Sequence, residues 1–196
     1  TLSFLTDPVG WLRDLTAFEA DCTIAAPFAL AFCQRRLAPA DIEALDLSAV
    51  EVVGLGGEPV NPAHCRAFFE ALAPAGLKPE AWRPGYGLGE ATCATHGTTG
   101  AGRVAVMRRG RFEPGEPVAV RRVTGLLAPG ELQTGEIEVA SVGIAGAGVD
   151  CWLQDETGAR VKGDAVCGEI VVAGQMLASH YLSGPGQRQP LSQRAL

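Results

Sequence analysis

The sequence predicts an α/β fold, in which a parallel-sheet subdomain with flanking helices is followed by a mostly β region. Two observations carry this prediction. Between residues 50 and 86, two extended apolar segments flank a helical pattern, as in a crossover between parallel strands. After about residue 97, short segments rich in β-branched residues alternate with Gly, Pro and Asp turns.

The first half of the chain contains the helical patterns. Apolar side chains recur at helical spacing over residues 8–20 and again over residues 27–37. A third helix is expected from Pro62 to Pro74, because proline is tolerated in a first helical turn and stops a helix further on. The short apolar segment 22–26 fits a buried strand.

The second half contains short β patterns. Val104 and its neighbours alternate with arginines, and the four-residue segment 155–158 is typical of a hairpin turn. Further strands are expected over residues 118–123, 135–142, 149–153 and 169–173.

Composition limits the function classes. The 196 residues carry a formal net charge of −6, which offers no broad basic surface, so we expect no nucleic-acid partner. The sequence has no apolar run of about eighteen residues and no signal-peptide pattern at its start. We therefore expect no membrane association and a cytoplasmic location. The length fits one domain or a large piece of one.

The cysteines are scattered. They occupy positions 22, 33, 65, 93, 151 and 167 with no Cys-x-x-Cys pair. Because several sit inside apolar runs, we expect reduced, mostly buried thiols that act as small hydrophobic side chains.

Two glycine-containing turns are the strongest functional signal. Gly56-Gly57-Glu58-Pro59-Val60 follows one predicted strand, and Tyr86-Gly87-Leu88-Gly89-Glu90-Ala91-Thr92 follows the next. Glycine lets a flat ring or a phosphate approach the backbone. In open α/β sheets, ligands bind beyond the carboxyl ends of the strands. Tyr86 is therefore a candidate to stack on a base, and Glu90 a candidate to hold magnesium between phosphates.

An ordered series of motifs resembles the fatty acyl-AMP ligases, within the adenylate-forming superfamily. The resemblance covers residues 1 to about 95 and returns near Gly143 and at Gly168-Glu169-Ile170. The motifs that carry it are Phe4-Leu5-x-x-Pro8-x-x-Trp11-Leu12, Pro27-Phe28-Ala29 running to Cys33, Leu45-Asp46-Leu47-Ser48, Gly57-Glu58-Pro59-Val60 and Tyr86-Gly87-Leu88.

This resemblance implies an activity. The family activates a fatty or other carboxylic acid with ATP and magnesium to an acyl-adenylate. The acyl group is then transferred to a phosphopantetheinyl acyl carrier protein, in polyketide, nonribosomal peptide or lipid biosynthesis.

The resemblance also assigns roles to residues. Gly57, Glu58 and Pro59 form one wall of the nucleotide site and Tyr86 the opposite face, while Gly87 and Leu88 bring backbone groups near the adenylate. Glu90 is the catalytic carboxylate that holds magnesium; the alternative for Glu90 is a carboxylate favoured at a helix start.

The acyl side of the site is expected on the helix that follows Pro27. Phe28, Ala29 and Phe32 are the substrate-binding candidates, and core packing is the alternative role for each of them. The family usually has Asn directly after the proline, so one residue fewer is present here.

The resemblance also divides the chain. Residues 1–96 correspond to an α/β adenylate-binding subdomain, 97–140 to an insertion-like β segment, and 141–196 to a β-rich segment with a C-terminal tail. In the family, the insertion is held to hinder thioester formation with free coenzyme A. The alternative for 97–140 is an ordinary β extension with a solvated arginine-rich face, whose arginines could meet phosphate or an acidic carrier protein.

Several family parts are missing from these residues: the phosphate-binding loop, the aspartate that holds the ribose, and the C-terminal domain with its catalytic lysine. We therefore expect an internal piece of a larger ligase that does not complete adenylation alone. The alternative is a non-catalytic remnant that serves as a scaffold or interaction module in an assembly line.

A weaker constellation lies beside the second turn. Glu90, Cys93 and His96 fall at three-residue spacing, which would suit a metal site or a Cys/His nucleophile pair. Nothing else in the sequence supports either function.

Overall fold

The structure is a computed structural model that describes residues 2–191. The end of the expected third segment, residues 192–196, lies outside the described part. The α/β half comprises α1 (Leu2–Thr6), α2 (Gly10–Ala17), β1 (Cys22–Ala25), α3 (Phe28–Gln34), α4 (Pro39–Ala44), β2 (Val52–Leu55), α5 (Pro62–Leu72) and β3 (Trp82–Tyr86), with short 3-10 turns η1 (Ala73–Ala75), η2 (Pro79–Ala81) and η3 (Gly89–Ala91).

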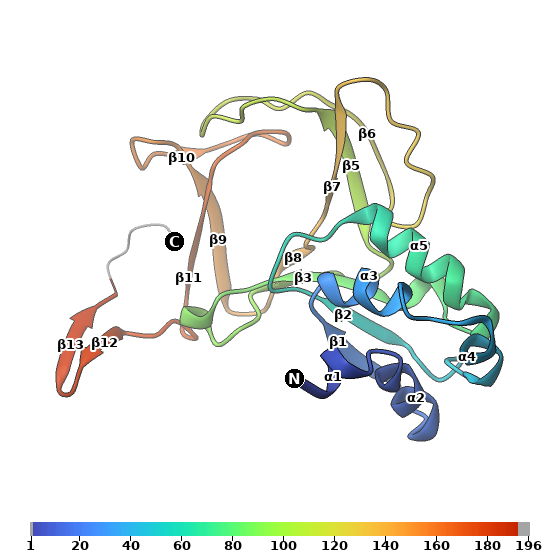
Figure 1. Cartoon of the computed structure of the whole chain (residues 1–196). Helices are drawn as coiled ribbons and strands as arrows, with labels where there is room; N and C mark the ends of the chain where they lie inside the picture. Colours follow the sequence, from blue (N-terminus) through green and yellow to red (C-terminus); the bar gives the residue numbers. More distant parts are fainter. Residues whose placement is uncertain (1, 192–196) are drawn as a thin grey trace.

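The rest of the chain is β structure (Figure 1). Its strands are β4 (His96–Gly97), β5 (Arg103–Arg108), β6 (Val120–Gly125), β7 (Glu136–Ala140), β8 (Ile144–Ala145), β9 (Val149–Gln154), β10 (Arg160–Val161), β11 (Glu169–Gly174), β12 (His180–Gly184) and β13 (Gln187–Pro190). The predicted α/β class, with helices followed by a mostly β region, is confirmed.

The sheet that carries the site is mixed. Strands β1, β2 and β3 run parallel, and Val53 on β2 pairs with Trp82 on β3. The crossover predicted from the sequence is thus confirmed, with α5 connecting β2 to β3. Two short antiparallel strands, β4 and β8, extend the sheet beyond β3.

Helix α5 starts and packs as its sequence dictates. The Asn61 side chain accepts hydrogen bonds from the backbone N–H groups of Ala63 and His64, which caps the helix directly before Pro62. Phe68 on its buried face contacts the rings of Trp11 and Trp82, at centroid distances of 6.0 and 6.2 Å. These aromatic contacts join α2, α5 and β3 in one core.

The core also draws on the second half of the chain. Val104 on β5 and Leu126 after β6 belong to the same buried cluster as Leu30, Leu55 and other side chains of the α/β half. Figure 1 shows α3 and α5 side by side over the parallel strands, with the β5–β6–β7 sheet rising from the N-terminal end of α5. Packing of Val104 and Leu126 therefore fixes this sheet relative to the parallel strands.

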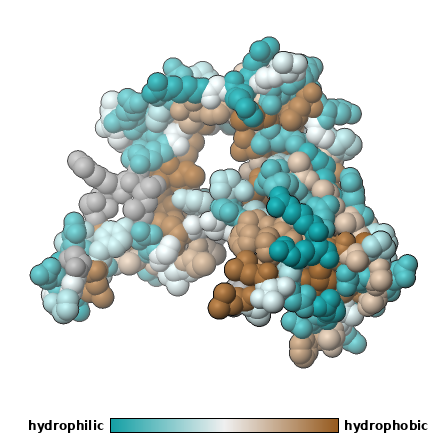
Figure 2. Space-filling view, viewed as in Figure 1, coloured by the Kyte–Doolittle hydropathy of each residue, from teal (hydrophilic) through white to brown (hydrophobic). Residues whose placement is uncertain are grey.

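The remaining β structure forms separate small sheets. β9 pairs with β10 and β11, and β12 pairs with β13 in a hairpin that projects from the molecule (Figure 1). Figure 2 shows an opening between the β5–β6–β7 sheet and the β9–β11 strands. The turn expected at 155–158 joins β9 to β10. There the Asp155 carboxylate accepts hydrogen bonds from Thr157 and Ala159, and these bonds lower its pKa.

Two helices were not predicted, α1 (Leu2–Thr6) and α4 (Pro39–Ala44). Helix α4 begins at Pro39, and the Asp41 carboxylate accepts a hydrogen bond from the Ala38 backbone N–H at 3.0 Å. The segment is too short for hydrophobic periodicity to reveal it, although proline followed by an acidic residue is a known start signal.

The prediction for the cysteines is partly wrong. All six thiols are free, but only Cys33 and Cys65 are buried, whereas Cys22, Cys93 and Cys151 are exposed. An apolar neighbourhood in sequence does not tell which face of a strand a side chain takes, and Cys22 lies on the edge strand β1. Within residues 2–191, no helix has both the length and the apolar character needed to cross a membrane.

Candidate functional site

A pocket opens where β2 and β3 end. It has a volume of about 450 Å³ and lies at the carboxyl edge of the two neighbouring parallel strands. Its lining residues are Gly57, Glu58, Pro59, Val60, Gly85, Tyr86, Gly87, Glu138, Val139, Ala140 and Val142. The structure thus brings together five of the residues that the sequence predicted for a nucleotide site, from two separate turns.

The two turns require glycine. Gly57 has a φ of +85°, a conformation that side chains disfavour. A Cβ at Gly87 would lie 1.5 Å from the backbone oxygen of Cys93, so this position accepts no side chain without a shift of the backbone. The second turn is therefore a tightly closed loop that brings its backbone to the pocket.

Thr95 and His96 fix the position of Tyr86. Its backbone oxygen accepts hydrogen bonds from the Thr95 N–H at 2.9 Å and the Thr95 hydroxyl at 3.2 Å. Its ring meets the His96 ring edge-on at 5.7 Å. Burial lowers the pKa of His96 from its ordinary value, so this imidazole is neutral near neutral pH. These contacts position the Tyr86 ring at the pocket wall.

Glu58 connects the pocket to the neighbouring helix. Its carboxylate accepts a hydrogen bond from the Phe28 backbone N–H at 2.5 Å, at the first residue of α3. The side chain therefore completes the start of α3, which has no capping side chain of its own.

The three substrate-side candidates lie on α3, outside the pocket lining. Phe28 is half exposed and touches the Phe4 ring at 6.2 Å, while Ala29 is buried. Phe32 packs against Phe4 at 5.8 Å, with the Arg36 guanidinium 4.0 Å from its ring centroid. Phe28 and Phe32 thus share contacts with α1, and Glu58 is their link to the pocket.

Leu88 and Glu90 lie just past the pocket, on the turn that leaves it. The Leu88 backbone oxygen accepts hydrogen bonds from Ala91 and Cys93, which closes the turn. The Glu90 carboxylate is partly exposed and accepts a hydrogen bond from the Tyr181 hydroxyl at 2.8 Å. This bond lowers the pKa of Glu90, so its carboxylate is ionised at neutral pH.

A family model described as AMP-binding enzyme matches residues 2–182, nearly the whole chain. The chain belongs to the AMP-binding enzyme family. Its relatives include a long-chain-fatty-acid–AMP ligase, FadD26, of Mycobacterium tuberculosis, 42% identical over 92 residues. They also include a 4-hydroxyphenylalkanoate adenylyltransferase of Mycobacterium marinum, 37% identical over 91 residues. Each alignment covers 46% of this chain and only 15–16% of the relative.

Solved structures of AMP-binding enzymes share the fold. A fatty acid AMP ligase from Legionella pneumophila matches with a TM-score of 0.81 at 26% identity, and covers 94% of this chain and 31% of its own. The acyl-adenylate ligase from the same organism, solved with acyl adenylate and pyrophosphate, gives a TM-score of 0.79 at 28% identity, with the same coverage. The chain thus spans about a third of the length of these structures and is similar to that part of them.

AMP-binding enzymes use ATP. The carboxylate that this segment offers near the pocket suits magnesium only when phosphate oxygens complete the coordination. Within residues 2–191, no three His, Cys, Asp or Glu side chains gather closely enough to hold a metal ion. Magnesium commonly takes one or two carboxylates plus substrate phosphates. The ionised carboxylate of Glu90, on the turn that leaves the pocket, fits this kind of site.

The alternative constellation of Glu90, Cys93 and His96 is wrong as a metal site. The His96 ring is engaged with Thr95 and Tyr86 instead. In the described part of the chain, no hydrogen bond joins Cys93 to His96, which removes the basis for a nucleophile pair. Three-residue spacing brings side chains together on one face only in a continuous helix. Here the chain turns at Thr92 and Cys93, which both have a positive φ.

The sequence did not reveal the second wall of the pocket. Glu138, Val139, Ala140 and Val142 come from β7 and the residues after it. Glu138 pairs with Arg66 of α5 at 2.6 Å, and both side chains are largely buried, at 8% and 16% exposure. The available signal was a pair of glutamates, Glu136 and Glu138, in the predicted strand 135–142. Alternate residues of a strand share one face, so two carboxylates on that face need cationic partners.

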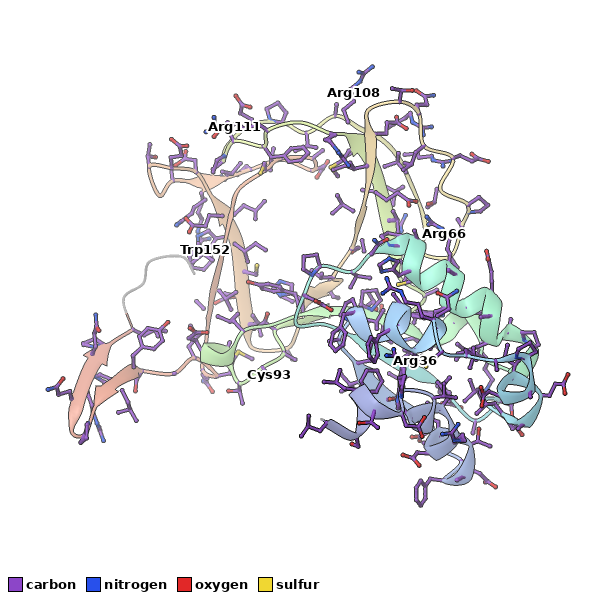
Figure 3. The ribbon with its side chains drawn as sticks, in the orientation of Figure 1. Arg36, Arg66, Cys93, Arg108, Arg111 and Trp152 are labelled. Atoms are coloured by element: carbon purple, nitrogen blue, oxygen red, sulfur yellow. The ribbon has the colours of Figure 1, made fainter. Side chains whose placement is uncertain are left out.

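The expected arginine-rich face is divided. Figure 3 shows Arg108 at the far end of β5 and Arg111 on the loop that follows, both away from the pocket. Arg111 pairs with Glu113, and Arg121 pairs with Glu136 at 2.6 Å. Several arginines of this segment are thus compensated within the segment itself.

Proposed function

We propose that the complete protein containing this chain is a cytoplasmic fatty acyl-AMP ligase. It activates a fatty or other carboxylic acid with ATP and passes the acyl group to a phosphopantetheinyl acyl carrier protein. One observation carries the proposal: the Gly57-Glu58-Pro59 turn and the Tyr86-Gly87 turn line the same pocket, at the edge of the sheet where nucleotides bind.

In this reaction a carboxylate oxygen attacks the α-phosphorus of ATP, and pyrophosphate leaves. The protein mainly positions the two reactants and neutralises charge. The Tyr86 ring stacks on the base, and the glycine turns let the backbone approach the nucleotide closely. Magnesium, when bound, supplies charge neutralisation at the phosphates, and Glu90 is the side chain of this segment that would hold it.

The acid is proposed to bind beside α3. Phe28 and Phe32 present apolar surface there, and the Glu58 carboxylate fixes the start of the helix against the nucleotide turn. A movement of either element is thereby transmitted to the other. This connection supports acyl recognition next to the adenylate.

The proposal of a carrier-protein acceptor rests on two points. The FadD26 relative bears the name of an acid–AMP ligase, so its named product is an acyl-adenylate that still needs an acceptor. Residues 97–140 form an ordered β segment whose end closes one wall of the pocket. A wall in this position is consistent with restricted access for free coenzyme A.

Exchange of radiolabelled pyrophosphate into ATP tests the proposed function in the complete protein. We expect exchange that depends on an added fatty acid and that Gly87→Ala abolishes, because a Cβ there meets the Cys93 backbone. Gly89→Ala is the matched control, since a Cβ at Gly89 meets no atom within 4 Å. Absence of exchange with every acid of a broad panel would instead support the scaffold alternative.

A further inference from the structure

The turn that carries Glu90 is fastened to a distant part of the chain. Three hydrogen bonds join it to the segment before and within β12: Ala178 N–H to the Glu90 backbone oxygen at 2.7 Å, Thr92 hydroxyl to the Met176 oxygen at 3.0 Å, and Tyr181 hydroxyl to Glu90 Oε1 at 2.8 Å. Figure 3 shows the turn, marked by Cys93, beside the strand that leads to β12. Residues about ninety positions apart thus form one local unit.

The first two bonds hold the backbone of the turn, and the third holds the carboxylate itself. A phenol that donates a hydrogen bond to one carboxylate oxygen restricts the rotation of the carboxyl group about the Cγ–Cδ bond. The backbone N–H of Glu90 itself also interacts with the carboxylate and contributes to its lowered pKa. Tyr181 is therefore the partner that orients the carboxylate from a distant segment of the chain.

We propose that Tyr181 is a positioning residue, which orients the Glu90 carboxylate so that it can hold magnesium together with ATP. The inference rests on the proposed function, because it assumes that Glu90 holds magnesium with ATP. Groups that hydrogen-bond a metal-ligating side chain orient it and tune its affinity. In this role Tyr181 donates one hydrogen bond to Oε1 and limits the orientations that the carboxylate can take toward the cation.

The test uses the complete protein with Mn²⁺ and ATP as the probe. Binding of Mn²⁺ in the presence of ATP is followed by electron paramagnetic resonance, and the magnesium dependence of pyrophosphate exchange gives an activity readout. Tyr181→Phe removes only the hydroxyl, so we expect about tenfold weaker Mn²⁺ binding, with an unchanged KM for the acid and an unchanged thermal midpoint. Leu182→Ala is the control, because this neighbouring side chain is exposed and its truncation should leave binding unchanged.

A double-mutant cycle with Glu90→Gln tests the positioning role of Tyr181 separately from the metal role of Glu90. If Tyr181 acts through Glu90, Tyr181→Phe has no further effect on Mn²⁺ binding in the Glu90→Gln background. A loss of binding with Glu90→Gln but not with Tyr181→Phe would overturn the positioning role and leave the proposed function intact. If the losses of Mn²⁺ binding in Tyr181→Phe and Glu90→Gln add in full in the double variant, the positioning role is overturned as well. Unchanged Mn²⁺ binding in Glu90→Gln would overturn the metal role of Glu90 in the proposed function.

Discussion

The Glu58 carboxylate accepts a hydrogen bond from the Phe28 backbone N–H at 2.5 Å, so a residue of the proposed nucleotide pocket completes the first turn of the helix that carries the substrate-side candidates. The two residues lie thirty positions apart and belong to different motifs of the sequence. Their contact explains how the proposed adenylate pocket and the proposed acyl side can be positioned together.

Removal of this carboxylate should affect both stability and acid binding. Glu58→Ala leaves the start of α3 without a partner, which should cost about 1 kcal/mol, as for other lost helix caps. We also expect a higher KM for the acid, because α3 is no longer fixed at its first residue. Denaturant unfolding and exchange kinetics measure the two effects. Glu51→Ala, an exposed glutamate before β2, is the control, and equal behaviour of the two variants would contradict the link.

Removing one partner of the buried ion pair between Arg66 and Glu138 should cost more stability than removing one partner of an exposed pair. Both side chains are largely buried, so Arg66→Met leaves an uncompensated carboxylate and should cost about 3 kcal/mol. Glu131→Ala breaks a pair in which Glu131 is 71% exposed, and should cost less than about 1 kcal/mol. Chemical denaturation of the two variants compares these costs. Similar losses would show that the buried pair does not hold β7 to α5.

Thiol reactivity should divide the cysteines by burial. Burial raises the pKa of Cys33 to about 11 and that of Cys65 to about 12, so both thiols stay protonated and shielded. Cys22 and Cys93 are exposed and should react first with iodoacetamide in the native protein. Peptide mapping by mass spectrometry identifies the labelled positions. Early labelling of Cys33 or Cys65 would mean that the core formed by α3 and α5 opens.

The neutral His96 should make stability depend on pH. Its folded-state pKa is lowered by burial from an ordinary value of 6.5. The unfolded chain therefore binds a proton at a pH where the folded chain does not, and stability should fall as the pH drops below about 6.5. Thermal midpoints measured between neutral and acidic pH test this, and His96→Gln should reduce the slope. An unchanged slope in that variant would assign the pH dependence to other groups.

Local patterns predicted the parallel-strand half well. The β2–α5–β3 unit follows from apolar runs, a capped helix start and proline stops, all of which act over a few residues. The two glycine turns were found for the same reason, since their conformational demands are local. Their meeting in one pocket followed from the rule that neighbouring parallel strands end at the same edge of a sheet.

Contacts between distant segments could not be predicted in the same way. The approach of Glu138 to Arg66 and of Tyr181 to Glu90 depends on how separate sheets pack, which no local period records. The exposure of Cys22 depends on β1 being an edge strand, which requires the strand order. Helix α4 was missed because its hydrophobic pattern is too short to be distinguished from a loop.

The most direct test of the account is calorimetric titration of the complete protein with a non-hydrolysable acyl-adenylate analogue, comparing the unmodified protein with Tyr86→Ala. Stacking of a base on an aromatic ring contributes about 1–3 kcal/mol, so we predict a dissociation constant at least several-fold higher for the variant. Phe18→Ala, an exposed aromatic outside the pocket, should bind as the unmodified protein does. Equal affinity of Tyr86→Ala and the unmodified protein would contradict the assignment of this pocket to the adenylate.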